Sequence, residues 1–531
     1  MSKKSLISGI SILGITGLIC KGVGVLYRIP LANIVGGEGL GLYQQVFPAY
    51  NLLLTLTSAG IPVAISRTVS HYVTLGKPGM AKRVFRVALG MLSVLGLIAS
   101  GLMLLLSGSL ARWVGTPEGR DSYMCIAPSL LLVCVMSAFR GYMQGTRNMM
   151  PTAISQLIEQ VGKVALALPL AAVGMQRGGW PLGAAGALLG TSIAEGVAMA
   201  YMMIDYAFKA RRSEIIGAPE TREGKVAGSL VRVAIPITLG ACIVPLASTI
   251  DSAMLKNLLM AGGLTSSEAG TRYGLYSGLV LTMINVPTAI AMAMSTNLVP
   301  DIAAGRARGD DGYVRAQALT GLKVGALVGF PCSVGMSLLA EPILFLCYGG
   351  SRYTAAQLHL TASLLQVSAL TIILFTMVQV TSGILQGAGR QKIPMYTLMA
   401  GVLCKIALNY ILVSIPSIGI AGAPIASIVC YSVSLIPNLI ATHRVTGMRF
   451  NWTEIVLKPL ACSLGMGAVV FALWRLVFGG TASQGGFISR LLPVVVCMAA
   501  GIIVYIAAAI LTGAISPELL PARLRKFGRR K

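Results

Sequence analysis

Charged residues are scarce in this sequence of 531 residues, and acidic residues are the scarcest of them. Only 11% of the residues are charged, whereas an ordinary soluble domain has about 25%. There are 17 acidic residues and three histidines, and no two of the ten cysteines have the C-x-x-C spacing of a metal or redox site. These absences exclude a soluble fold with a charged surface, and they argue against a metal centre or a disulfide framework.

Hydrophobic residues make up 55% of the chain and occur in long runs. A membrane-spanning helix needs about 20 apolar residues. We therefore predict an all-α polytopic membrane protein with about fourteen transmembrane helices and no sizeable soluble domain. The predicted spans are 5–27, 43–68, 86–108, 123–145, 151–174, 182–206, 230–255, 273–299, 316–339, 359–386, 394–414, 420–441, 455–477 and 489–513.

The net charge of +25 would suggest a nucleic-acid partner in a soluble protein. Here the basic residues lie mostly in loops between spans, and their distribution indicates how the protein is oriented in the membrane. With both termini in the cytoplasm, 28 Lys and Arg fall on the cytoplasmic side and 9 on the other. We expect a multi-pass membrane protein with both termini in the cytoplasm, with its basic tail against anionic lipid headgroups and no nucleic acid bound.

Five short segments recur in the same order at offsets of 225 to 243 residues, and they indicate two homologous halves. Examples are Gly141-Tyr-Met-Gln-Gly145 with Gly383-Ile-Leu-Gln-Gly387, and Ile61-Pro62 with Val286-Pro287. An even number of spans per half makes the repeat parallel, and such halves rock about a central substrate site. The predicted parts are a six-helix lobe (1–210), a cytoplasmic linker (211–229), a second six-helix lobe (230–445), two additional helices (446–513) and a basic cytoplasmic tail (514–531).

Ionisable residues within the spans are candidate substrate-binding residues, because a charge inside the bilayer is costly. Lys21 and Arg28 lie seven residues apart, on one face of the first helix. Lys163 and Lys405 occupy matching places in the two halves, so we expect both to face the interface between the halves. Arg28 could also lie at the outer interface and extend towards the headgroups.

Acidic residues within the spans have two interpretations. Glu159 either contributes to a site or neutralises Lys163, four residues on. Asp251 either binds a coupling cation or pairs with Lys256. Taken together, the cations outnumber the carboxylates, and a cation-lined cavity suits an anionic headgroup such as a phosphate or pyrophosphate.

Motifs of soluble enzymes are absent, since no Gly-Lys pair precedes Ser or Thr as a P-loop requires. We predict a transporter and not an enzyme, with no metal and no cofactor. A cation-coupled multidrug exporter is one alternative, although its cavity would be acidic and aromatic. A membrane-embedded glycosyltransferase or ligase is another, but it would need a long external loop with catalytic residues.

Three segments carry a resemblance to a known family: Lys21-Gly-Val-Gly-Val-Leu-Tyr-Arg-Ile-Pro30, Gly36-Gly-Glu-Gly-Leu-Gly-Leu-Tyr-Gln44 and Ala59-Gly-Ile-Pro-Val-Ala-Ile-Ser66. The chain resembles the stage V sporulation protein B and polysaccharide-biosynthesis branch of the multidrug/oligosaccharidyl-lipid/polysaccharide (MOP) exporter superfamily. The similarity extends over nearly the whole chain.

This resemblance implies a flippase that moves polyprenyl-pyrophosphate-linked saccharides, with the peptidoglycan precursor lipid II as the expected cargo. It implies a protein of the bacterial cytoplasmic membrane that works by alternating access without ATP hydrolysis. The parallel repeat predicts in addition that the two halves bend near Pro62 and Pro287. In the related lipid II flippases the first helix carries an essential arginine, and Lys21 has that place here. Those flippases also have an arginine pair in the second span, where this chain has Leu54 and Thr55.

Overall fold

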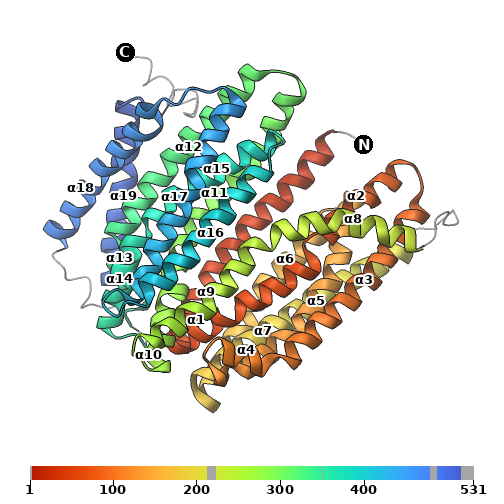
Figure 1. The fold of residues 1–531 in the computed structure, drawn as a ribbon, viewed down its shortest axis with the longest axis horizontal. Coiled ribbons are helices and arrows are strands. Elements are labelled where there is room, and N and C mark those ends of the chain that lie inside the picture. Colours follow the sequence, from red (N-terminus) through yellow and green to blue (C-terminus); the bar gives the residue numbers. More distant parts are fainter. Residues whose placement is uncertain (1–2, 212–222, 351, 479–486, 516–531) are drawn as a thin grey trace. The chain divides into compact units, whose positions relative to one another are not determined.

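The computed structural model describes residues 3–211, 223–350, 352–478 and 487–515, and they are helical with no β-strand. Contacts divide the chain into two compact units, residues 1–274 and 275–531, which are described separately (Figure 1). The first unit contains α1 (Lys3–Ser58), α2 (Ile61–Thr74), α3 (Pro78–Leu105), α4 (Ser107–Trp113), η1 (Pro117–Gly119), α5 (Arg120–Gly145), α6 (Met150–Gly162), η2 (Lys163–Ala167), α7 (Leu168–Arg211), α8 (Glu223–Ala241), α9 (Ile243–Ala261) and α10 (Ser266–Gly274).

The second unit begins at a π-helical turn and ends with the last two long helices. It contains η3 (Leu275–Val280), α11 (Leu281–Ala307), α12 (Asp311–Leu338), α13 (Ala340–Tyr348), α14 (Ala355–Ser368), α15 (Leu370–Gly387), α16 (Lys392–Val413), η4 (Gly419–Ala421), α17 (Gly422–Thr446), η5 (Thr453–Leu457), α18 (Lys458–Val477) and α19 (Phe487–Leu511).

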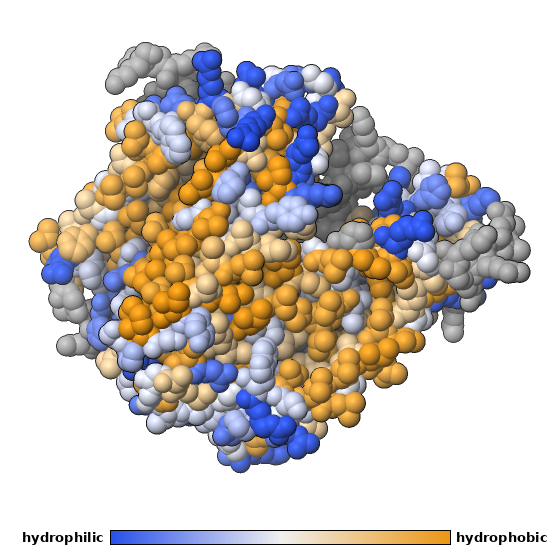
Figure 2. All heavy atoms as spheres, viewed as in Figure 1, coloured by the Kyte–Doolittle hydropathy of each residue, from blue (hydrophilic) through white to orange (hydrophobic). Residues whose placement is uncertain are grey.

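Large hydrophobic side chains are exposed over helices of both units (Figure 2). Leu105 and Leu476 are each 84% exposed and Leu511 is 81% exposed. Among the described residues, eleven helices are long and apolar enough to cross a membrane, or twelve if α8 and α9 form one bent span. Such a surface would aggregate in water, whereas lipid is its natural solvent. The chain is a multi-pass membrane protein with an all-α fold.

Two of these long helices are too long for one crossing. The helical segment Gly22–Thr74, which joins most of α1 to α2, contains 53 residues. The segment Met150–Phe208, which joins α6, η2 and most of α7, contains 59 residues, and one crossing needs about 20. The first is broken at Gly36, where φ is 70°, and the second at Gly179, where φ is 71°. Only glycine adopts such angles readily, so these two residues mark sharp turns between successive spans. The number fourteen itself stays a prediction.

The predicted lobe boundaries differ from the division by contacts. The repeat assigns α8, α9 and α10 to the second half, but these helices pack against α1 and α2 of the first unit. The basic tail lies, except for residues 514 and 515, outside the described residues, as does most of the linker 211–229. The lobe boundaries therefore stay a prediction.

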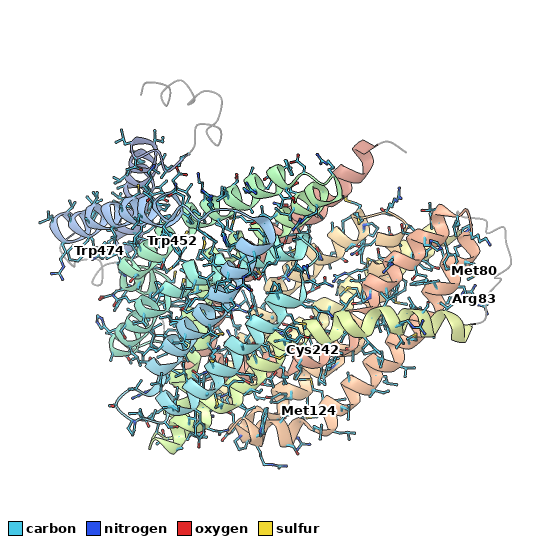
Figure 3. All side chains as sticks on the ribbon, turned by 45° about the horizontal axis from the view of Figure 1, so that its top comes forward. Met80, Arg83, Met124, Cys242, Trp452 and Trp474 are labelled. Atoms are coloured by element: carbon cyan, nitrogen blue, oxygen red, sulfur yellow. The ribbon has the colours of Figure 1, made fainter. Side chains whose placement is uncertain are left out.

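The last two helices pack onto the second unit rather than standing apart. The hydroxyl of Tyr505 in α19 donates to the carbonyl of Leu327 in α12 at 2.9 Å, and Lys323 of α12 forms an ion pair with Glu454 of η5. Trp452 and Trp474 (Figure 3) are 22 residues apart, about 33 Å along a helix. Tryptophans at that separation suit the two interfaces of one bilayer, so α18 has the length of a full span.

Close contacts at glycine residues occur at matching places in the two units, and they test which residues of the two halves correspond. A Cβ atom built on Gly141 of α5 would lie 2.9 Å from the carbonyl oxygen of Pro62, and one built on Gly383 of α15 would lie 2.8 Å from that of Ser295. Pro62 therefore corresponds to Ser295, and its predicted match with Pro287 is wrong by eight residues. The helix breaks before Pro62, between Ser58 and Ile61, whereas Pro287 lies inside the continuous α11.

The hairpin between the fifth and sixth predicted spans also has its counterpart. A Cβ atom on Gly186 would lie 2.3 Å from the carbonyl oxygen of Leu170, and one on Gly422 would lie 2.7 Å from the Cβ atom of Leu412. Both pairs fall at matching places of the two halves. The backbones touch at these points, so the turn leaves no room for a side chain.

We predict that Gly186→Ala destabilises the protein by about 1–3 kcal/mol, because the added methyl group must displace backbone atoms. The matched control is Gly101→Ala in α3, where the described part of the chain places no atom within 4 Å of the new methyl group, apart from the neighbouring backbone of α3 itself. That variant should be unchanged or slightly more stable. Thermal unfolding of the two purified proteins in one detergent measures both effects, and equal melting temperatures would contradict the packing described here.

Candidate functional site

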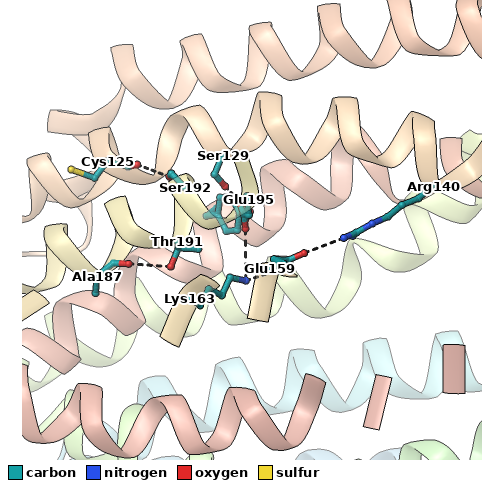
Figure 4. A network of polar contacts seen from close by, with 10 residues as sticks. Cys125, Ser129, Arg140, Glu159, Lys163, Ala187, Thr191, Ser192 and Glu195 are labelled. Carbon is teal, nitrogen blue, oxygen red and sulfur yellow. Dashed lines mark hydrogen bonds and ion pairs between the residues drawn. The ribbon is translucent and has the colours of Figure 1, made fainter. Parts of the chain in front are cut away.

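A cluster of charged side chains lies inside the first unit, where α5, α6 and α7 pack together (Figure 4). Glu159 accepts a hydrogen bond from Lys163 Nζ at 2.9 Å and another from Arg140 Nη2 at 3.3 Å. Lys163 Nζ also lies 3.8 Å from Glu195 Oε1. The side chain of Glu195 is 3% exposed, and the other three are each 16% exposed. Two cations and two carboxylates thus form one formally neutral cluster, which is buried at Glu195 and half-buried at the other three side chains.

Hydroxyl groups surround this cluster and orient its charges. Arg140 Nε donates to Ser155 Oγ at 3.0 Å. The hydroxyl of Tyr50 donates to Glu195 Oε1 at 3.3 Å and accepts from Ser129 Oγ at 2.8 Å. The other oxygen of Glu195, Oε2, is buried without a hydrogen-bond partner among the described residues. A buried polar atom in that condition is unusual, so a proton, a water molecule or a ligand group would complete the cluster at this point.

Local helix geometry brings Lys163 to both carboxylates. Glu159 and Lys163 are four residues apart, on one face of the helix. The helix widens into the π-helical turn η2 at Lys163, a distortion that is common at functional sites. A Cβ atom on Gly162 would lie 2.8 Å from that of Ala194, and one on Gly190 would lie 2.4 Å from the Cα atom of Ala167. The helices therefore approach closely enough for Lys163 to reach across to α7.

One face of α1 looks onto this cluster. A Cβ atom on Gly24 would lie 3.7 Å from Gln160 Oε1 of α6. Positions 20, 24 and 28 share one helix face. The predicted Arg28 is half-buried on that face, while the side chain of Lys21 lies outside the described residues and its role stays a prediction.

At the positions of the second half that match the charged cluster, the sequence keeps only the lysine. Lys405 is half-buried in α16 and matches Lys163 in the repeat. The residues that match Arg140, Glu159 and Glu195 are uncharged; they are Ser382, Gly401 and Tyr431. The repeat therefore relates the two lysines to each other, but the charged residues around Lys163 are not repeated around Lys405. That both of them face an interface between the halves stays a prediction.

Asp251 is half-buried in α9, which continues to Ala261, six residues beyond the predicted end of the span. Lys256 consequently lies in the helix and not in a loop. Its ammonium donates to the carbonyl oxygen of Gly115 at 2.7 Å and to Thr116 Oγ1 at 2.6 Å. Both interpretations of Asp251 stay predictions.

Sequence reasoning missed Arg140 and Tyr50. Arg140 lies near the predicted end of the fourth span, where an arginine that extends towards the headgroups is the common case. A signal was nevertheless present, because Arg140 is the one charged residue between Asp121 and Arg147. Tyr50 carries no sequence signal of its own, since aromatic residues in apolar runs usually pack in the core.

Comparison with known families decides the class of this membrane protein. Residues 6–305 match the family model described as Polysaccharide biosynthesis protein, and residues 236–411 match the one described as MatE. The first match covers more than half of the chain. The chain belongs to the polysaccharide biosynthesis protein family. Its relatives and structural neighbours place it in the MOP exporter superfamily, whose members are transporters and flippases.

Relatives of this family member include two proteins of Bacillus subtilis (strain 168). "Stage V sporulation protein B" is 28% identical over 432 residues, which cover 80% of this chain and 81% of that protein. "Lipid II flippase MurJ" is 26% identical over 556 residues, which cover 100% of this chain and 99% of that protein. The similarity to the second protein therefore runs from end to end.

Solved structures of the superfamily share the fold. A structure titled "Lipid II flippase MurJ, inward closed conformation" aligns with a TM-score of 0.70 and 13% identity, covering 94% of this chain and 98% of that one. An inward-facing multidrug resistance MATE family transporter aligns with a TM-score of 0.67 and 16% identity, covering 84% and 100%. At these identities the likeness shows the fold alone.

We predict that Lys163→Ala destabilises the protein by about 3–5 kcal/mol, because it leaves the buried carboxylate of Glu195 without a cation and Glu159 with Arg140 alone. The double variant Lys163→Ala with Glu159→Ala should recover part of that loss, with a coupling energy of about 0.5–3 kcal/mol. Thermal or denaturant unfolding of the purified variants measures the cycle.

The exposed ion pair of Arg306 and Asp311 provides a control for the buried cluster. Its side chains are 38% and 71% exposed, and the two atoms are 3.1 Å apart. Because surface pairs contribute about 0–1 kcal/mol, Arg306→Ala should have little effect. A loss as small for Lys163→Ala as for Arg306→Ala would show that the cluster does not hold the lobe together.

Proposed function

We propose that this protein flips a polyprenyl-pyrophosphate-linked saccharide, such as the peptidoglycan precursor lipid II, across the cytoplasmic membrane. The observation that carries the proposal is the end-to-end similarity to a protein named as a lipid II flippase, over 100% of this chain and 99% of that one. The polysaccharide biosynthesis family match points to the same class of cargo. The partners are then a lipid-linked oligosaccharide and the surrounding membrane lipids.

The buried cations of the first unit offer chemistry for a pyrophosphate. Arg140 and Lys163 share Glu159 as their common acceptor. An entering pyrophosphate would compete with Glu159 for both cations, and the guanidinium can bind two phosphate oxygens at once. In this proposal Arg140 joins the residues predicted to bind substrate: Lys21, Arg28, Lys163, Lys405, Glu159 and Asp251.

A cation-coupled multidrug exporter is the second candidate, because MATE transporters share the fold. The observation that favours it is that Oε2 of Glu195 has no hydrogen-bond partner among the described residues, since a buried carboxylate oxygen can take up a proton or a cation. Against it, Lys163 and Arg140 already neutralise the two carboxylates of the cluster. We therefore favour the anionic, lipid-linked cargo, with proton or cation coupling through Glu195 as the alternative.

Transport would proceed by alternating access, with the polyprenyl tail in lipid and the headgroup passing through the protein. The chemistry requires no bond to be made or broken, so the protein acts as a transporter and not as an enzyme. The distribution of Lys and Arg supports cytoplasmic termini. In that orientation the turn at Glu118 faces outwards and the turn at Arg147 faces the cytoplasm.

The orientation can be tested with single cysteines at those two turns. A membrane-impermeant maleimide added to intact cells should label Glu118→Cys, and it should label Arg147→Cys only after the cells are permeabilised. The unaltered chain, whose ten cysteines are native, provides the background. Labelling of Arg147→Cys in intact cells at the rate seen for Glu118→Cys would reverse the proposed topology or break the span map.

The cargo can be tested through Lys21 and Arg140. If these residues grip a pyrophosphate, Lys21→Ala and Arg140→Ala should each abolish flipping, while Lys21→Arg should keep most of it because the charge is retained. The measurement is accumulation of the lipid-linked precursor on the cytoplasmic side of cells that depend on this protein, at matched expression. Normal flipping by both alanine variants would exclude these cations from the substrate path, and accumulation of no lipid-linked saccharide on depletion would refute the proposed cargo.

A further inference from the structure

A buried lysine joins three separate segments at one end of the first unit. Lys256 of α9 is 2% exposed, and its ammonium donates to the carbonyl oxygen of Gly115 and to Thr116 Oγ1. Thr116 in turn donates to Gln45 Oε1 of α1 at 2.8 Å. The ammonium of Lys256 therefore connects α9 with the turn before α5, and Thr116 extends this connection to the second arm of α1, which is the part that follows Gly36. We call Gln45, Thr116 and Lys256 the clasp.

Further contacts tie the same segments together around the clasp. Asn257 Nδ2 donates to the carbonyl oxygen of Trp113 at 2.9 Å. Ser267 of α10 donates to Glu38 of α1. The hydroxyl of Tyr273 donates to the carbonyl oxygen of Gln44 at 3.4 Å. These bonds all run between α9 or α10 and segments of the predicted first half.

Glycine residues let the backbones of α1 and α10 touch beside the clasp. A Cβ atom on Gly41 would lie 2.4 Å from the carbonyl oxygen of Gly270, and one on Gly274 would lie 2.2 Å from that of Gly37. Such close approach closes this end of the unit with main-chain atoms. It leaves the clasp side chains as the polar part of the seam.

The clasp borders a polar cavity of about 260 Å³. Glu38, Glu118 and Trp180 line it together with Lys256 and Gln45. Gln45 Nε2 is buried without a hydrogen-bond partner among the described residues, so one end of its amide is already unsatisfied in this arrangement. The acceptors of Lys256 in the clasp are a carbonyl and a hydroxyl rather than a carboxylate, and water in the cavity could replace them.

The position of the clasp relative to the two predicted halves indicates what it could do. The repeat assigns α9 and α10 to the second half, and the clasp binds them to helices of the first half. We infer that Lys256 is the positioning residue of a gate: it holds the seam between α1 and α10 closed, at the outer end in the proposed orientation, and its release opens the exit. This inference rests on the alternating access of the proposed function.

A substrate-free labelling experiment tests the gate. Leu42 of α1 lines the cavity and is 2% exposed, so Leu42→Cys should react slowly with an external impermeant maleimide while the seam is closed. Adding Lys256→Met keeps the length of the side chain and removes its hydrogen bonds. We expect the labelling rate to rise at least about tenfold, the change expected when hydrogen bonds to a charged group are lost.

Two further variants separate gating from misfolding. Thr116→Val has the same shape but breaks the relay to Gln45, and it should raise the rate by a smaller factor than Lys256→Met. Lys77→Met, at an exposed lysine between α2 and α3, is the matched control and should leave the rate unchanged. Should Lys256→Met fail to fold, Thr116→Val carries the test alone.

An unchanged labelling rate in folded Lys256→Met, or in Thr116→Val where that variant carries the test, would overturn the inference. A disulfide between Glu38→Cys and Ser267→Cys provides the converse test: it should stop flipping, and reduction should restore it. Full flipping with the cross-link complete would also overturn the gate. Because labelling needs no substrate, a parent protein that flips no lipid-linked saccharide but responds to Lys256→Met would refute the cargo and leave the gate standing.

Discussion

The ammonium of Lys163, held between the carboxylates of Glu159 and Glu195, is the interaction on which the first unit depends. Charges that are removed from water are tolerated only when they are paired and hydrogen-bonded. Pairing across α6 and α7 requires the helices to touch, and glycines at 162 and 190 permit that approach. The π-helical turn that begins at Lys163 contributes to the same pairing, because it alters the direction of the Lys163 side chain.

Packing and charge are distributed differently over the two halves. The glycine contacts of α5 with α2 recur between α15 and α11, so the repeat preserves the way in which helices meet. The charges do not recur: among the residues that match the cluster, the second half keeps only Lys405. A scaffold needs both halves to pack alike, whereas a substrate site needs its charges only once. This difference separates the residues that build the fold from those that act on a cargo.

Much of this architecture could be predicted from the sequence, because long apolar runs and the period of the repeat are strong signals. Lys163 and Glu159 were predictable as a pair from their spacing alone. Their neighbours Arg140 and Tyr50 were not, because contacts between helices far apart in the chain leave no local pattern. The match of Pro62 with Pro287 failed for a related reason: two prolines before apolar residues are easily aligned, and only the contact of Gly141 with Pro62, set against that of Gly383 with Ser295, fixes the register.

The first helix connects the charged cluster with the seam between α1 and α10. Its first arm approaches α6 at Gly24, and its second arm contacts the cluster at Tyr50 and the seam at Gly41 and Gln45. Between them lies Gly36, at a φ of 70° that other residues rarely adopt. A change in the angle between the two arms is therefore taken up at this one residue. A cargo that draws Lys163 away from Glu195 would disturb the carboxylate to which Tyr50 donates, and Tyr50 lies only five residues along α1 from Gln45 of the clasp.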